Sequence, residues 1–142
     1  MNHLLDAYKN DWILFTEASF IAINRADEIN ALRLIAAAEA LNSEQSLPKI
    51  ARGYLRLHKL ELKEAIRIYD EVLQKEPDNE LAKTLLGVCL GLMPNGKDLE
   101  RGEKILTELA RAKDPLAQQT SATALNFVHR FVKKEPGPAG RA

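Results

Sequence analysis

A spacing of thirty-four residues recurs along this chain and restricts what it can fold into more than any other feature. Gly53 is followed by Ala65 and Tyr69, twelve and sixteen residues later. The small-residue position of Gly53 recurs thirty-four residues earlier, at Ser19, and thirty-four residues later, at Gly87. Self-similarity at such a period indicates a supersecondary unit that buries its apolar face by stacking on copies of itself.

The residue types that recur have a packing reason. Two antiparallel helices approach closely only where one presents a residue without bulk, so we expect Gly53 to lie against the helix that carries Ala65. Tyr69 and its equivalent Ile35 are expected to fill the space against the next unit. Pro77 follows as a helix-ending signal. The pattern therefore predicts pairs of helices rather than strands.

A third unit follows with an interruption. It carries three extra residues around the segment 93–98, which contains a proline and a glycine. After this segment, Gly102 and Leu106 take the places that Ala65 and Tyr69 occupy in the middle unit. The third unit is thus expected to be a helix pair with a longer connection.

These offsets resemble the tetratricopeptide repeat, whose period is about thirty-four residues. The chain departs from that pattern at Lys49, Arg52 and Arg56, where the family has tryptophan, leucine and tyrosine, and at Ser43, where it has proline. The resemblance implies an all-α fold, a right-handed superhelix of three tetratricopeptide-like helix pairs with a C-terminal capping helix.

The expected organisation is one repeat domain over residues 1–132, with Asp114 as N-cap and Pro115 as the first residue of the last helix. The repeats are expected at about 12–45, 46–79 and 80–114, with the capping helix at 115–132. The helices are expected at about 10–24, 27–42, 47–58, 62–75, 79–92, 98–112 and 115–133. The tail 133–142 has two prolines and no periodicity, and we expect it to be disordered.

Charge and cysteine content restrict the partners. Twenty basic residues balance twenty acidic ones, whereas binding to nucleic acid or to an anionic membrane favours a basic excess. A single cysteine, Cys89, excludes an intramolecular disulfide and fits a reducing compartment. The first twenty residues contain no uninterrupted apolar run of a signal peptide, and nothing has the length of a membrane span. We expect a cytoplasmic protein.

Candidate catalytic groups are sparse. His3, His58 and His129 lie far apart without a second ligand at metal spacing, so no metal site is predicted. Cys89 lies in an apolar helix, where burial raises the pKa of a thiol and makes it a packing residue. No glycine-rich phosphate loop follows a strand, and no nucleophile–base pair can be nominated. We therefore expect no enzyme and no cofactor.

In a tetratricopeptide stack the first helix of each pair lines the concave surface, which the resemblance carries over to this chain. The residues that it assigns to partner binding are Phe20, Ile23, Leu47, Ile50, Tyr54, Leu57, His58, Val88 and Leu92. Two interpretations stay open: these side chains form core, or they form an apolar groove that receives an amphipathic helix. Ile50 and Tyr54 replace the lysine and asparagine that a cradle for chaperone carboxylates would need, which argues against that role.

The run from Leu32 to Pro94 resembles the small tetratricopeptide chaperones of bacterial type III secretion systems, most of all the needle-subunit chaperones, with the chlamydial branch as one candidate among them. The resemblance implies a cytoplasmic chaperone that holds an amphipathic helix of the needle subunit and prevents its polymerisation before export. It also implies a small helical co-chaperone. Two alternatives stay open: a chaperone for secreted translocators, and a scaffold whose repeats self-associate.

Overall fold

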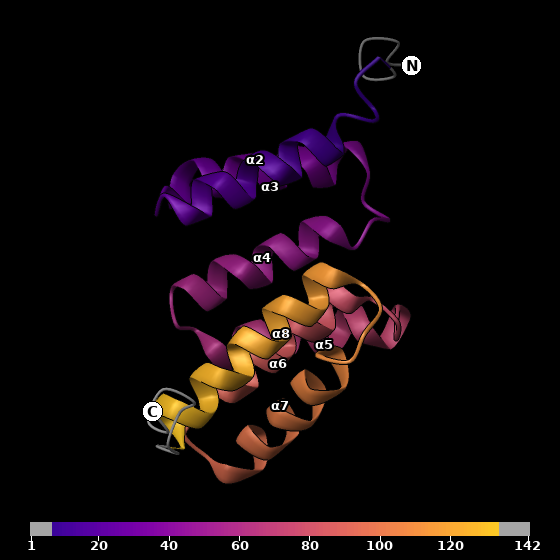
Figure 1. The fold of residues 1–142 in the computed structure, drawn as a ribbon. Helices are drawn as coiled ribbons and strands as arrows, with labels where there is room; N and C mark the ends of the chain where they lie inside the picture. The colour runs from indigo at the N-terminus through magenta and orange to yellow at the C-terminus, as the bar shows by residue number, and fades with distance from the viewer. Residues whose placement is uncertain (1–6, 134–142) are drawn as a thin grey trace. The chain divides into compact units, whose positions relative to one another are not determined.

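The computed structural model describes residues 7–133, without the side chains of 131 and 132, and within that range it contains helices and no strand (Figure 1). The helices are α2 (Trp12–Asn24), α3 (Glu28–Leu41), α4 (Leu47–His58), α5 (Leu62–Lys75), α6 (Glu80–Gly91), α7 (Gly96–Leu109), α8 (Pro115–Phe127) and the short π-helix η1 (Val128–Val132). The all-α prediction is confirmed, and each predicted helix is found with its ends within a few residues. Of the predicted disordered tail, residues 134–142 lie outside the described range.

The chain forms two compact units, residues 1–68 and 69–142, and the division falls inside α5. These are the N-terminal and the C-terminal unit. The single repeat domain over residues 1–132 stays a prediction.

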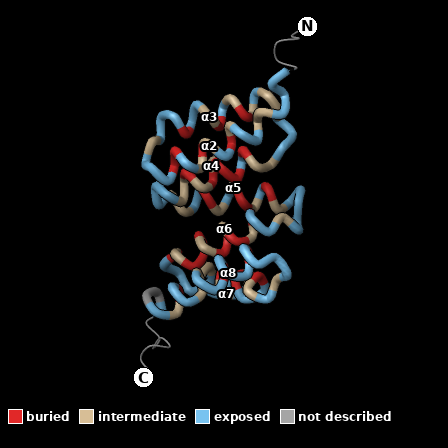
Figure 2. The backbone as a smooth tube through the Cα atoms, turned by 45° about the horizontal axis from the view of Figure 1, so that its top comes forward, coloured by how far each residue is buried: buried red, intermediate tan, exposed pale blue. Residues whose placement is uncertain are grey.

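In the N-terminal unit, α2 and α3 form a helical hairpin and α4 packs against both helices. Their shared core contains Ile23, Ala31 and Leu55, with Leu34 and Tyr54 packed partly against it. The buried positions lie on the sides of these helices that face one another (Figure 2). The core is therefore made by helix faces that recur every three to four residues, as an amphipathic pattern requires.

The two turns of the N-terminal unit repeat at the period of the sequence. Ala26 and Leu60, thirty-four residues apart, are the non-glycine residues with positive φ in the described chain, and both have φ 58°. In the first turn the Asp27 N–H donates to the Ala22 carbonyl over 2.8 Å, and the bond between the equivalent residues of the second turn is 2.9 Å. Both turns are thus Schellman-type helix ends with a left-handed residue. The third unit has Pro94 at this place, and a proline ring excludes positive φ.

In the C-terminal unit, α6 and α7 form a second hairpin, and α8 packs against both of its helices. Gly102 of α7 lies directly on α6: a Cβ added there would be 2.9 Å from Gly91 N, 2.9 Å from Leu90 Cβ and 3.1 Å from Gly87 O. A Cβ added at Gly87 would be 2.7 Å from the side chain of Leu106. The expected close approach at small residues is therefore found between α6 and α7.

Side-chain caps explain where the later helices begin. Asn79, Asn95 and Asp114 each accept a hydrogen bond from the backbone N–H three residues on, over 2.9–3.0 Å. The predicted cap at Asp114, with Pro115 as first helical residue, is confirmed. Helix α7 begins at Gly96, two residues earlier than predicted, because the Asn95 cap lies within the inserted segment.

The single cysteine lies in the core of the C-terminal unit. Cys89 is fully buried on α6, and burial raises the pKa of its thiol to about 12. Its predicted role as a packing residue is confirmed. None of the helices in the described part of the chain has the length and apolar character needed to cross a membrane.

Candidate partner-binding surfaces

Helices α2 and α4 bring three of the predicted binding residues into contact. The rings of Phe20 and Tyr54 lie 5.2 Å apart between centroids, and those of Tyr54 and His58 lie 4.5 Å apart, edge to face. Phe20 and Tyr54 are half-buried and His58 is exposed. We call these three residues the aromatic face. Such amphipathic rings offer large contact area at a low cost in conformational entropy.

Tyr54 is fixed in this arrangement by its hydroxyl group. The hydroxyl donates a hydrogen bond of 2.7 Å to Asn24 Oδ1, which joins α4 to the end of α2. Burial raises the pKa of the Tyr54 phenol, with a smaller opposing effect of the Asn24 hydrogen bond. The hydroxyl therefore stays protonated at neutral pH, and the ring is held in place as a neutral surface.

The other predicted residues of this unit divide by burial. Leu47 and Leu57 are half-buried and keep part of their side chains at the surface. Ile23 and Ile50 are 2% and 1% exposed and belong to the interior. The tight packing of the helix faces that carry them leaves no side-chain surface for a partner. For these two positions the core interpretation describes the structure, and we leave them out of the candidate surface.

Ion pairs join α4 to α3 beside this surface. Lys59 Nζ lies 2.9 Å from Glu28 Oε1, and Arg52 Nε donates to Glu39 Oε1 over 2.7 Å. Exposed pairs of this kind contribute little each, about 0–1 kcal/mol. Their effect here is to keep these charged side chains paired with one another beside the aromatic face.

In the C-terminal unit, Val88 of α6 and Leu92, directly after its end, line a groove whose other wall is α8 and the start of η1. The groove has a volume of about 650 Å³. Its lining residues are Val88, Leu92, Leu116, Gln119, Thr120, Thr123, Ala124, Phe127 and Val128. None of these side chains is charged. We call it the α6–α8 groove; its size is typical of a binding site, and its chemistry selects for apolar groups.

The wall formed by α8 was not predicted as part of a site. Leu116, Thr120, Thr123 and Phe127 follow one another at helical spacing and line the groove, and Leu116 is 72% exposed. A neighbouring stripe of smaller residues, among them Ser121, is buried. Both stripes can be read in the sequence at helical spacing: one has Leu116 and Phe127 at its ends with two threonines between them, and the other contains the small residues Ala117 and Ser121.

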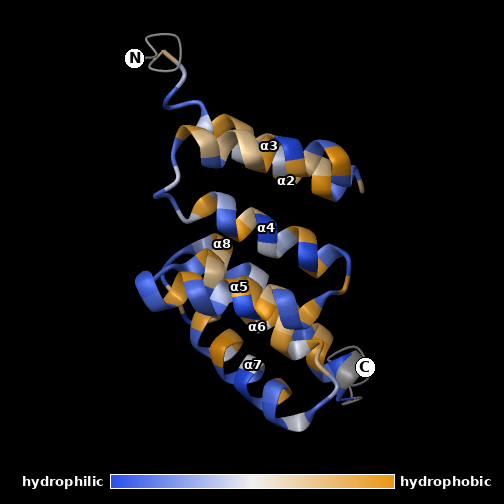
Figure 3. Ribbon diagram, turned by 180° about the vertical axis from the view of Figure 1, so that it is seen from behind, coloured by the Kyte–Doolittle hydropathy of each residue, from blue (hydrophilic) through white to orange (hydrophobic). Residues whose placement is uncertain are grey.

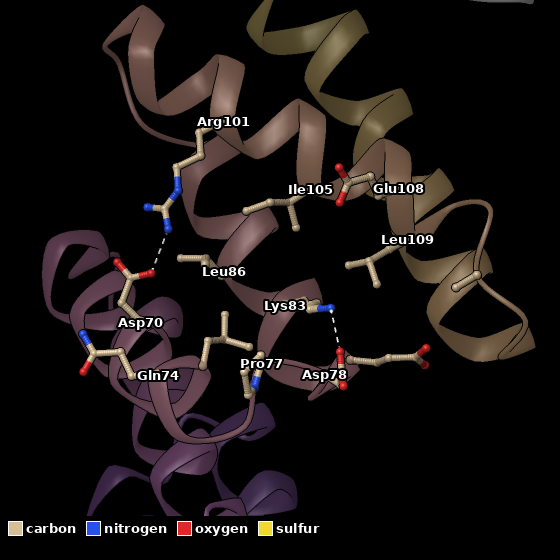
Figure 4. A pocket seen from close by; sticks show the side chains of 13 residues that line it. Asp70, Gln74, Pro77, Asp78, Lys83, Leu86, Arg101, Ile105, Glu108 and Leu109 are labelled. Atoms are coloured by element: carbon tan, nitrogen blue, oxygen red, sulfur yellow. Dashed lines mark hydrogen bonds and ion pairs between the residues drawn. The ribbon is translucent and has the colours of Figure 1, made fainter.

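A second hollow of about 830 Å³ lies between the end of α5, α6 and α7 (Figure 4). Leu86 and Ile105 line it beside the Arg101–Asp70 ion pair, whose Nη2–Oδ1 distance is 2.8 Å. Unlike the α6–α8 groove it mixes apolar and charged side chains, and its ion pair joins α7 to the end of α5. This hollow was not predicted from the sequence.

Among the described residues, no group of three or more histidine, cysteine or acidic side chains is placed to hold a metal ion. His58 lies in the aromatic face. His129, in η1, has its Nε2 atom 3.5 Å from Glu103 Oε1. Both histidines are therefore found beside packing partners rather than in a ligand set.

Comparison of the chain with protein-family models, with curated proteins and with solved structures found no match. The aromatic face and the α6–α8 groove are therefore the basis for a functional proposal.

Proposed function

We propose that this protein is a tetratricopeptide-type chaperone of a bacterial type III secretion system, which sequesters an amphipathic helix of the needle subunit in the cytoplasm. The right-handed superhelix of three helix pairs with a capping helix is part of this proposal, as is the link to virulence. The observation that carries it is the α6–α8 groove, an uncharged and apolar hollow that contains the predicted residues Val88 and Leu92.

The shape of this groove favours a helix as ligand. Its two walls are themselves helices, and side chains in a row on a third helix can fit between them. Burying about 500 Å² of apolar surface contributes on the order of 12 kcal/mol at roughly 25 cal/mol per Å². Association and ordering oppose this with about 4–15 kcal/mol. A client must therefore fill most of the apolar surface of the groove to bind tightly.

The mechanism we propose is competition. A needle subunit polymerises through apolar helix faces, and a chaperone that covers one such face keeps the subunit monomeric until export. Because the lining of the groove is uncharged, binding there depends on apolar contact rather than on charge steering. The affinity for the client should accordingly change little with salt concentration.

Co-expression in the native host, followed by mass measurement of the intact complex, tests the proposal. A one-to-one complex with a small helical exported protein, or a ternary complex with a co-chaperone, would support it. Val88→Asp places a charge in the groove and should abolish the complex. Tyr54→Ala, which removes a ring of the aromatic face, should also abolish it when combined with Leu57→Asp on the same helix α4. Leu81→Asp is the matched control, because Leu81 lies on α6 and is 43% exposed outside the groove lining. Normal binding by the charged groove variant would contradict the proposal.

The second candidate function is self-association as a scaffold, and the surface of the α2–α3 hairpin favours it. Leu14 and Ile21 of α2 are 61% and 56% exposed, and Ile29 of α3 is 67% exposed. Hydrophobic residues are spread over this hairpin in Figure 3. Such side chains fit either a small helical co-chaperone or another copy of the chain. The mass of the protein purified alone separates the two: a monomer argues against the scaffold, and a homo-oligomer that captures no client argues for it.

A further inference from the structure

The groove wall formed by the end of α8 is held in place by two contacts to residues that do not line the groove, Gly91 and Glu103. The first is made by Val128, which begins the π-helix η1. A Cβ added at Gly91 of α6 would lie 2.7 Å from Val128 Cγ2. Val128 is 2% exposed and also lines the groove. Gly91 therefore lets this end of the wall lie directly on the α6 backbone, and a methyl group there would push it away.

The second contact is an ion pair on the α7 side of η1, between Glu103 and Lys133, with the His129 ring beside it. Glu103 Oε1 lies 2.8 Å from Lys133 Nζ and 3.5 Å from His129 Nε2. This oxygen is shielded from solvent, and the Glu103 side chain as a whole is 22% exposed. A shielded carboxylate oxygen is unfavourable without a cation beside it, so Glu103 favours the position in which η1 brings Lys133 to it.

Helix α8 itself packs on the α6–α7 hairpin through small side chains. Its buried residues are the small Ala117 and Ser121, whereas Leu116 and Phe127 are 72% and 45% exposed. The hydroxyl of Ser121 is buried without a hydrogen-bond partner. Small buried side chains make few van der Waals contacts, so a shift of the last turn of α8 costs little by itself. The position of that turn therefore depends strongly on what holds η1.

We infer that Glu103 and Gly91 are positioning residues that set the width of the α6–α8 groove through η1, although neither lines the groove. The inference rests on the proposed function only in taking the groove as the client site. A shift of the wall that carries Phe127 and Val128 would remove the contacts they offer to an apolar ligand. Ligand affinity and the opening of η1 should therefore change together.

Hydrogen exchange of the full-length chain tests this without a client. Glu103→Gln should raise the exchange rates of the η1 amides about fivefold, the effect of losing an ion pair worth about 1 kcal/mol. The amides of α6 should keep their rates. Glu100→Gln is the matched control, because Glu100 is exposed on the same helix. Exchanging the charges, with Glu103→Lys and Lys133→Glu together, should restore slow exchange, a result that a general loss of stability would not give.

Ligand affinity is the second measurement. The probe is anilinonaphthalene sulfonate, and the relevant part of its binding is the part that Val88→Asp removes. Glu103→Gln and Gly91→Ala should each weaken that part about fivefold. Unchanged exchange in η1 and unchanged probe affinity in both variants would overturn the inference. Because neither readout uses the client, a failed co-expression experiment would contradict the proposed function and leave the positioning role standing.

Discussion

Gly102→Ala is expected to destabilise the protein, although alanine is the better helix former. At this position an added Cβ would lie 2.9 Å from Gly91 N and 3.1 Å from Gly87 O, which are backbone atoms, and 2.9 Å from Leu90 Cβ. None of the three atoms can turn aside by rotation of a flexible side chain. The helices α6 and α7 would have to separate, which places the cost at the upper end of the usual range for overpacking, about 1–3 kcal/mol.

The opposing gain is the helix propensity of alanine, about 1 kcal/mol relative to glycine. The net expectation for Gly102→Ala is a loss of about 1–2 kcal/mol in the free energy of unfolding. Urea denaturation followed by circular dichroism measures this change. Hydrogen exchange in α6 and α7 would show whether the loss is located there.

Gly96→Ala is the matched control for this substitution. Gly96 begins the same helix, and an added Cβ would meet no heavy atom within 4 Å. This variant should be as stable as the parent protein or more stable, by up to about 1 kcal/mol. If Gly102→Ala were as stable as Gly96→Ala, the close approach of α6 and α7 at small residues would not limit their packing, and the reasoning from the repeat would fail.

Three further changes test other features of the structure. Leu60→Gly should raise the free energy of unfolding by about 0.5–1 kcal/mol in the same urea experiment, because Leu60 has φ 58° and is 72% exposed. Asp114→Ala should lower the free energy of unfolding by about 1 kcal/mol because it removes the N-cap of α8, and Asp114→Asn should keep most of the contribution of the cap. The Cys89 thiol, with its pKa raised to about 12, should react with iodoacetamide at pH 8 only after unfolding. The thiol of the unfolded chain ionises at lower pH than the buried one. The contribution of Cys89 to the free energy of unfolding is therefore fully present below about pH 8.5 and is lost as the pH rises toward 12.

The helix pattern could be predicted because it depends on local information. Apolar residues at helical spacing and the turn at Pro77 fix where helices exist, and Asp114 with Pro115 marks the start of the last one. The start of α7 was missed by two residues because Asn95 was read as part of an insertion rather than as a cap. The contact between Gly87 and Gly102 could be predicted because small residues at both positions indicate the close approach of two helices.

The candidate site was predicted less well, because the sequence does not fix how each helix is rotated about its own axis relative to its neighbours. Less than one helix turn separates a surface residue from a core residue on α2. Phe20 is half-buried, whereas the side chain of Ile23, three residues later, is 2% exposed. Repeat positions taken from a family assign both to the concave surface, but the side of a helix that stays open depends on which neighbours cover it. Periodicity gives the apolar stripe, and only the contacts of the folded chain decide which edge of the stripe is covered.

The α8 wall of the groove shows the same limit from the other direction. Its two stripes are visible in the sequence, but composition alone favours burying the larger side chains of Leu116 and Phe127 rather than Ser121. The structure does the reverse: the smaller residues pack inward and the large ones stay at the groove. Burying small residues lets α8 approach the α6–α7 hairpin closely, as Gly91 does for Val128. Because Leu116 and Phe127 line the groove instead of being buried, apolar surface stays exposed there. This exposed apolar surface is the physical reason to expect a partner at the α6–α8 groove.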